Sequence, residues 1–236
     1  MRSSLPATTF VVVWALVAAC NSDPSSPKYD PDIPAAWAPS VTNQWFVLAP
    51  GSVATFKAIT PEGAESTRVE VLSTTRDVNG VTATVVLDQV SLDGSLIEET
   101  FDWYAQDTDG NVWYLGEDSK EYENGVVVST AGSWEWGVDG ALPGIIMWAD
   151  PSAHVGEAYR QEFYRGEAED WAKVLSVNEP VTVPNGSYNG CIKTEDWNAL
   201  SSGREHKYYC SSIGLVLEIG KRGNGTRTEL ESFSTP

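Results

Sequence analysis

Four dipeptides with the composition of tight hairpin turns recur along this chain and restrict its fold more than any other feature. They are Asn79-Gly80, Asp93-Gly94, Asp109-Gly110 and Asn124-Gly125. Asn-Gly and Asp-Gly favour the short turns that join antiparallel neighbours, because these residues tolerate positive φ angles. The segments between them are rich in β-branched and aromatic residues, which favour strands. The sequence therefore predicts a sheet built from strands that are neighbours along the chain.

Expected strands fill most of the chain after Trp45. They are Val53 to Ile59, Thr67 to Thr74, Thr82 to Val90, Ile97 to Gln106, Val112 to Glu117, Val126 to Thr130, Ala158 to Tyr164, Ala168 to Leu175, Val181 to Val183, Tyr188 to Asp196, Glu205 to Cys210, Leu215 to Ile219 and Thr226 to Phe233. The segment 168–175 also has helical propensity, but an isolated two-turn helix would be marginal in water. The predicted fold class is all-β, with an antiparallel meander forming a curved sheet, half-barrel or barrel-like domain. This single domain is expected over residues 41–236.

The hairpin over residues 98–122 allows two registers, which differ in whether two carboxylates meet. A type I turn with a bulge at Gly110 places Asp107 opposite Asn111. A two-residue turn shifts each pairing by one position and places Asp102 opposite Glu117. We favour the bulged turn because it gathers the apolar side chains on one face. These side chains are Trp103, Ala105, Trp113 and Leu115.

The N-terminus has the features of an export signal. Residues 1–19 contain one basic residue and then an apolar run that is short for a membrane helix. The run ends in Val17-Ala18-Ala19-Cys20, which resembles a lipobox, where the cysteine becomes the acylated first residue of the mature chain. An ordinary signal peptide with a nearby cysteine is the alternative. Residues 20–40 are rich in Pro, Ser and Asp and predict a lipid-anchored flexible tether.

These features predict an exported protein held in the bacterial cell envelope by an N-terminal acyl chain such as palmitate. Asn21 follows the cysteine, and the resemblance to bacterial lipoproteins implies that such a residue permits export to the outer membrane if the host is Gram-negative. The formal net charge of the whole chain is −18. Such a charge repels phosphate and therefore excludes nucleic acid as a partner, whereas it favours solubility, cations or basic partners.

Two cysteines remain for a disulfide in an oxidising compartment if Cys20 carries lipid. They are Cys191 and Cys210, and two buried thiols are the alternative to a bridge. If the cysteines face each other across antiparallel strands, the same register places Glu195 opposite His206. This pair is a candidate polar site that could orient a base or bind a cation, or it is a weak ion pair on the surface.

Two further groups of residues are candidates for ligand binding. Glu162, Glu167 and Glu169 are a candidate cation site, with Ca²⁺ as the expected ion, because Ca²⁺ prefers carboxylate and carbonyl oxygens. A solvated acidic rim is the alternative. Trp134, Trp136 and Trp148 belong either to the core or to the mouth of a pocket for an apolar ligand.

The sequence contains no recognisable catalytic motif. It has two histidines and no nucleophile elbow, HExxH or CxxC motif. We therefore expect a non-enzymatic binding or interaction protein of the cell envelope, whose partner is a small apolar ligand, a cation or another envelope protein. The rival hypothesis is a secreted hydrolase that uses carboxylates with or without His206.

The C-terminal third carries a resemblance to a family. The segments Val181 to Tyr188, His206 to Tyr209 and Ile213 to Glu218 resemble a pattern of uncharacterised bacterial envelope lipoproteins. The hairpin from Asp102 to Glu117 and the segment 159–170 are similar to a narrower subset of them. The resemblance implies a half-barrel or barrel-like β fold and supplies no catalytic residues. Cys210 and the two serines after it depart from the pattern, which makes the disulfide a local feature of this chain.

Overall fold

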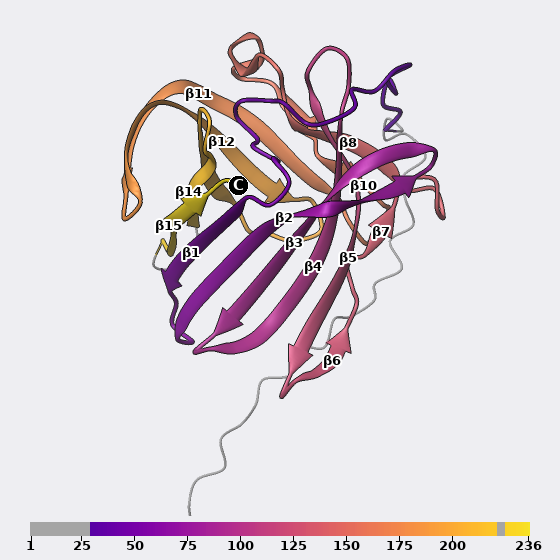
Figure 1. Ribbon diagram of the computed structural model, residues 1–236. Coiled ribbons are helices and arrows are strands. Elements are labelled where there is room, and N and C mark those ends of the chain that lie inside the picture. Colours follow the sequence, from indigo (N-terminus) through magenta and orange to yellow (C-terminus); the bar gives the residue numbers. More distant parts are fainter. Residues whose placement is uncertain (1–28, 221–224) are drawn as a thin grey trace, which may run out of the picture.

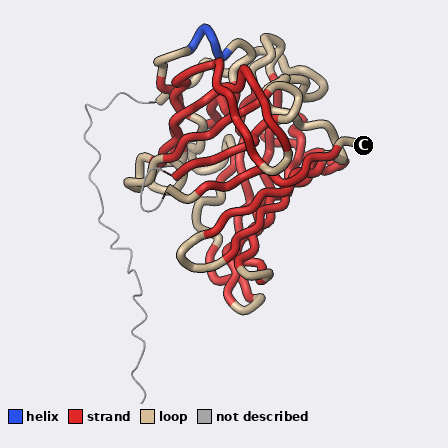
Figure 2. The backbone as a smooth tube through the Cα atoms, turned by 90° about the vertical axis from the view of Figure 1, so that its left-hand side faces the viewer, coloured by secondary structure: helices blue, strands red, loops and turns tan. Residues whose placement is uncertain are grey.

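The computed structural model describes residues 29–220 and 225–236, and its regular structure is almost entirely β. The strands are β1 (Val53–Ile59), β2 (Ala64–Val78), β3 (Val81–Leu92), β4 (Ser95–Gln106), β5 (Val112–Glu123), β6 (Val126–Ser129), β7 (Trp134–Glu135), β8 (Leu142–Met147), β9 (Ala158–Arg160), β10 (Glu162–Phe163), β11 (Asp170–Val183), β12 (Gly186–Asn198), β13 (Glu205–Cys210), β14 (Gly214–Gly220) and β15 (Arg227–Ser234). Among the described residues, helical structure is limited to the 3-10 turn η1 (Pro151–His154), as Figure 2 shows.

All strands belong to one sheet, which curls into a nearly closed barrel (Figure 1). Their order is β10-β8-β5-β4-β3-β2-β1-β15-β14-β13-β12-β11-β9, and β6 and β7 pair with β5. The two edge strands, β9 and β10, are separated along the chain by Gln161 alone. A Cβ atom on Gly144 of β8 would lie 2.4 Å from the carbonyl oxygen of Arg160. Glycine is therefore required where β8 passes the connection between the edge strands β9 and β10.

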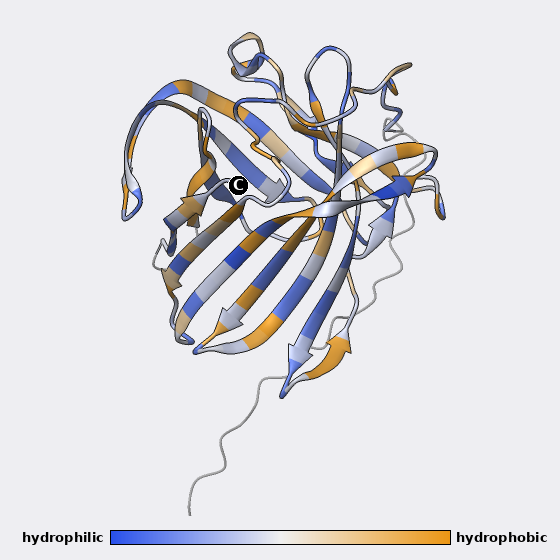
Figure 3. Cartoon of the chain, in the orientation of Figure 1, coloured by the Kyte–Doolittle hydropathy of each residue, from blue (hydrophilic) through white to orange (hydrophobic). Residues whose placement is uncertain are grey.

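Apolar and polar residues alternate along the strands and appear as stripes in Figure 3. This alternation gives each strand two faces of different character. The largest core cluster contains Val85, Trp103, Leu115 and Met147, together with buried residues of β11, β12 and β13. A second cluster surrounds the disulfide and contains Val181, Val183, Tyr208, Leu217 and Leu230.

Irregular pairing bends the two long hairpins, β2–β3 and β11–β12. The register of β2 against β3 shifts between Val71 and Thr75, and β11 and β12 show three further shifts. Bulges bend a strand and increase its twist. The β11–β12 hairpin curls round the side of the barrel, and at its tip Asn185 N donates to Leu230 O of β15 at 3.0 Å (Figure 1).

The N-terminal segment over residues 29–40 packs against the barrel. Trp37 forms an isolated bridge with Asp107, and its ring lies 6.1 Å from that of Trp113. The Tyr29 hydroxyl donates to Pro143 O at 2.9 Å. This part of the expected tether differs from the flexible chain that its composition predicts, because its aromatic residues find apolar partners on the barrel.

The structure confirms the predicted fold class and most of the strands. Most of segment 168–175 is a strand, but this strand, β11, runs from Asp170 to Val183, whereas the sequence predicted two separate strands. The bulges between Val174 and Val181 interrupt the alternation that would have revealed one strand. Within residues 29–220 and 225–236, no helix has the length and apolar character needed to cross a bilayer.

Candidate functional site

A cavity of about 230 Å³ lies inside the barrel, which we call the central cavity. Its wall comes from β1 to β4 on one side and from β13 to β15 on the other, with contributions from β8 and from the segment before β1. Most of the wall is apolar. The apolar side chains include Phe46, Leu48, Phe56, Val69, Val71, Val86, Leu215 and Phe233. The charged residues of the wall are Asp88, Asp102, Lys207 and Glu218.

Lys207 is the positive charge of this wall. Its Nζ lies 3.1 Å from Glu205 Oε1 and 3.4 Å from Glu218 Oε1. Lys207 stands opposite Glu218 in the β13–β14 pairing, so both side chains project from the same face of the sheet. Burial lowers the pKa of Lys207, but the carboxylates of Glu205 and Glu218 outweigh it and hold the pKa well above its ordinary value. Lys207 is therefore a cation that its two neighbours already neutralise.

Two polar atoms that line the central cavity have no hydrogen-bond partner. They are Ser52 Oγ and Asp88 Oδ1, and both atoms are buried. Burial is the largest cause of a pKa of Asp88 well above its ordinary value, and Asp102, Glu98 and Glu218 raise it further. Buried polar atoms are nearly always paired in folded proteins, so an unpaired group that faces a cavity indicates a place for a ligand or water.

A tyrosine joins two carboxyl groups beside the cavity. The hydroxyl of Tyr114 lies 2.5 Å from Asp102 Oδ1 and 2.9 Å from Glu117 Oε2. A phenol has one proton to donate, so both contacts are hydrogen bonds only when one carboxyl group is itself protonated. Burial raises the pKa of Asp102 to about 6. Burial and the Asp102 charge raise the pKa of Glu117 to about 8, so Glu117 holds the proton at neutral pH.

This carboxyl pair results from a second bulge in the central hairpin. The turn is the favoured bulged type, because Asp107 N donates to Asn111 O at 3.0 Å. The pairing then shifts at Gly116, so that Asp102 nevertheless stands opposite Glu117. Gly116 has a φ of 143°, and a Cβ atom there would lie 2.5 Å from Trp134 O. The predicted bulged turn is confirmed. The expectation that this turn would keep Asp102 and Glu117 from facing each other is wrong.

A second pocket of about 370 Å³ lies beyond Lys207, and Asp170, Asp196 and Glu205 line it. Asp170 Oδ1 and Asp196 Oδ2 are buried without a partner. Thr194 Oγ1 donates to the other carboxyl oxygen of Asp196. Burial raises the pKa of Asp196 to about 6. Lys207 thus separates two spaces whose walls carry more carboxyl groups than cations.

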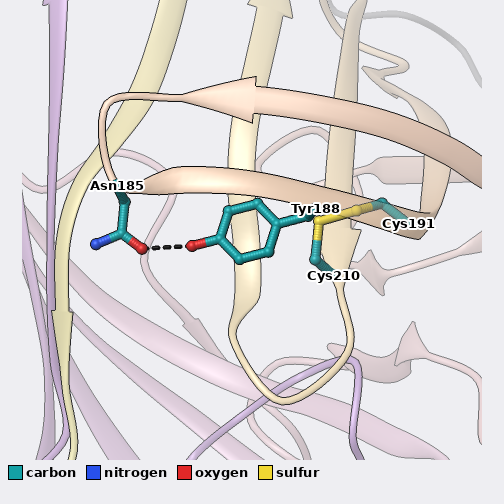
Figure 4. Close-up of a disulfide and its surroundings, with 4 residues drawn as sticks. All are labelled: Asn185, Tyr188, Cys191 and Cys210. Carbon is teal, nitrogen blue, oxygen red and sulfur yellow. Dashed lines mark hydrogen bonds between the residues drawn. A yellow bond between two sulfur atoms is a disulfide. The ribbon is translucent and has the colours of Figure 1, made fainter.

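The disulfide between Cys191 and Cys210 forms as predicted (Figure 4). Nearby, the Tyr188 hydroxyl donates to Asn185 Oδ1 at the end of the β11–β12 hairpin. The register derived from the bridge also holds, because Glu195 pairs with His206. Glu195 Oε2 lies 4.0 Å from His206 Nε2, and Glu195 Oε1 lies 2.5 Å from Arg204 Nη1. These side chains share the face of the disulfide, opposite to the face that carries Lys207.

The three glutamates of the candidate cation site do not form one group that could bind a metal ion. Glu162 is buried and accepts from Trp134 Nε1 at 2.6 Å. Glu169 Oε2 lies 3.2 Å from Arg160 Nη2, and Glu167 is exposed. The part of the chain that the structure describes holds no group of three or more His, Cys, Asp or Glu suited to a metal ion. The acidic segment is instead divided between a buried hydrogen bond, an ion pair and solvent.

The three candidate pocket tryptophans lie away from the central cavity. Trp134 is buried beside Tyr114, and the ring of Trp136 lies 6.1 Å from that of Trp37. Trp148 stacks on His154 with ring centroids 3.9 Å apart, and it lines a surface groove of about 760 Å³ below the N-terminal segment. The tryptophans therefore serve packing and a surface groove, while smaller apolar residues line the interior.

The residues of the central cavity were missed by reasoning from the sequence. Asp88, Lys207 and Glu218 occupy positions where alternation places the side chain on the buried face of a strand. A charged residue at such a position, in a strand that otherwise alternates normally, is the signal that identifies them. That signal depends on knowing the bulges of each strand, because a bulge exchanges its two faces.

Comparison with known proteins gives similarity in structure alone. No protein-family model matches the chain, and no curated protein matches its sequence. A provisionally assigned exported protein with a YmcC-like fold from Bacteroides fragilis superimposes with a TM-score of 0.49 and 13% identity. The similarity covers 82% of this chain and 100% of the other. A provisionally assigned lipoprotein from Parabacteroides distasonis gives a TM-score of 0.37 and 12% identity over 81% of this chain and 99% of the other.

Proposed function

We propose that this protein is a non-enzymatic binding protein of the bacterial cell envelope that holds a small amphipathic molecule in its barrel. The observation that carries the proposal is the central cavity, which combines an apolar wall with unpaired polar atoms at Ser52 and Asp88. Ligand sites typically combine a mainly apolar lining with a few polar groups that orient the ligand. The volume of about 230 Å³ is below the roughly 300 Å³ at which sites for drug-sized ligands begin, so the ligand is small.

Native mass spectrometry of the mature protein, purified from its own host, tests this proposal. We expect a bound small molecule that denaturation releases. Ala54→Phe should abolish its retention, because Ala54 lines the cavity and a phenyl group would fill part of it. Val127→Phe is the matched control, because Val127 is exposed on β6. Absence of any small molecule from both the wild-type protein and the control would contradict the proposal.

The proposed location rests on the lipobox at Cys20, which lies outside the described residues. Acylation there would place the barrel at a membrane surface, with the segment from Cys20 to residue 28 as the connection. We expect Cys20→Ala to release the protein from the membrane fraction, and density-gradient separation of the membranes to place the wild-type protein in the outer membrane of a Gram-negative host. Retention of Cys20→Ala in the membrane fraction would contradict the anchor.

A hydrolase that uses Asp102 and Glu117 is the second candidate function. The two pKa values of about 6 and about 8 suit a base and an acid at neutral pH, and Asp102 reaches the cavity. Tyr114 lies between the two carboxyl groups, however, where a substrate would need to enter. His206 lies on the opposite face of the sheet and is not part of this arrangement. Hydrolysis of ester or glycoside substrates that Asp102→Asn abolishes would favour the enzyme over the binding protein.

A further inference from the structure

The charged groups around the central cavity differ in whether they already have partners. Lys207 is bound by Glu205 and Glu218, and Asp102 accepts from Tyr114. Among the charged residues that line this cavity, Asp88 is the one with a buried oxygen atom that has no hydrogen-bond partner among the described residues. The polar group of a ligand would therefore find its partner at Asp88.

The sign of the surrounding charge selects among possible ligands. Asp102 and Glu218 lie in the same wall as Asp88, while Lys207, which also acts on Asp88, lies between the carboxylates of Glu205 and Glu218. A carboxylate or phosphate in this space would face uncompensated repulsion in a medium of low dielectric constant. A cation would be attracted by the same groups. The net charge of −18 acts in the same direction on the approach of the ligand.

We propose that the ligand of the central cavity is a small primary amine with an apolar tail, whose ammonium group binds the carboxylate of Asp88. This inference rests on the proposed binding function. The tail would contact the aliphatic and aromatic wall, which includes Val69, Val86 and Leu215. The hydroxyl of Ser52 offers a second partner to any polar substituent on that tail.

The surroundings of Asp88 favour a ligand group that carries a positive charge. Burial is the main reason why the pKa of Asp88 stands well above its ordinary value; the neighbouring carboxylates add to it, and Lys207 opposes it without reversing it. An ammonium group in contact would reverse this effect, because an adjacent opposite charge favours the ionised carboxylate. The ammonium group would also satisfy the unpaired oxygen, which is otherwise a cost to the folded protein.

Calorimetric titration of the intact mature protein with hexylamine, hexanol and hexanoate tests the inference. The three probes share one chain length and differ in the charge of the head group. We expect hexylamine to bind at least about tenfold more tightly than hexanol, and hexanoate to bind more weakly than both. Asp88→Asn should reduce the affinity for hexylamine by about tenfold and leave that for hexanol nearly unchanged. Asp118→Asn is the matched control, because it makes the same chemical change at an exposed position.

The possible outcomes separate this inference from the proposed function. If none of the probes binds and no molecule is found by native mass spectrometry, the binding function itself fails. If hexanol or hexanoate binds as tightly as hexylamine, binding in the cavity stands but the amine is wrong. Full affinity of Asp88→Asn for hexylamine would remove Asp88 from the site. The comparison of the three probes on the wild-type protein decides the class of ligand even if Asp88→Asn fails to fold.

Discussion

The two faces of the β12–β13 hairpin carry similar residue types in very different surroundings. One face, which we call the outer face, holds the disulfide, Glu195 and His206. The side chains of Glu195 and His206 remain 19% and 20% exposed. The other face, which we call the inner face, holds Asp196, which is 4% exposed, and Lys207, whose side chain is 26% exposed and lies between two carboxylates. The register is the same for both faces, since all of these residues belong to one pair of strands.

This comparison shows that a cross-strand pair of charges does not contribute a fixed amount to the free energy of unfolding. Water screens the Glu195–His206 pair, so its contribution to stability should be small. On the inner face, Lys207 Nζ lies 3.1 Å and 3.4 Å from two carboxylates, so its removal would leave these like charges beside each other. Substitutions on the two faces should therefore differ in effect even where the chemical change is the same.

The largest expected effect follows from removing the inner cation. Lys207→Met should destabilise the protein by about 2–4 kcal/mol, because Glu205 and Glu218 would lose the cation between them, while their partial exposure to solvent reduces the loss below that of a fully buried pair. Lys193→Met, on the outer face of the same hairpin, is the control and should cost less than about 1 kcal/mol. Urea unfolding followed by circular dichroism measures both. Equal effects of the two substitutions would remove the distinction between the faces.

The next largest effect concerns the disulfide on the outer face. Replacing Cys191 and Cys210 together by Ala should lower the free energy of unfolding by about 2–4 kcal/mol, because the unfolded chain regains the freedom that the bridge removes. Reduction of the wild-type protein should produce a loss of similar size in the same unfolding experiment. A loss below about 0.5 kcal/mol would show that strand pairing and packing alone hold this hairpin.

A smaller effect is expected from the pH dependence of stability, through Glu117 beside Tyr114. Above its ordinary pKa of 4.5, the unfolded chain loses a proton that Glu117 in the folded protein keeps until about pH 8. The unfolded state therefore binds fewer protons in this window, and the stability contributed by this group falls as pH rises. Glu117→Gln should remove about 1–3 kcal/mol of this decline between pH 5 and pH 9. An identical pH profile for the variant would contradict the raised pKa.

The smallest effect belongs to the polar pair on the outer face. Glu195→Gln should change the free energy of unfolding by about 0.2–1 kcal/mol and should leave ligand binding in the cavity unchanged. High salt should diminish this change, since salt screens exposed charges. A loss of ligand binding in Glu195→Gln would show that the outer face influences the central cavity, and it would make Glu195 and His206 candidate functional residues again.

The sequence predicted the fold well because its strongest signals are local. Turn dipeptides, alternation and two cysteines were sufficient for the class, most strands and the register of the β12–β13 hairpin. The site was less accessible, since it depends on positions where alternation is broken. The bulge next to Gly116 shifts the pairing by one residue. Asp102 therefore stands opposite Glu117, although the turn alone would have kept them apart. Asp88 of β3 and Lys207 of β13 line the same cavity because the sheet curls into a barrel, which no local sequence pattern encodes.

The pairing of β1 with β15 also has a consequence for the order of folding. Val53 pairs with Ser234, so the first and last strands of the barrel meet late compared with the local hairpins between them. Ala54 and Phe233 line the central cavity and lie on these two strands. Hairpins in the middle of the chain can form before the chain is complete, but the central cavity closes only after the final strand has paired with β1.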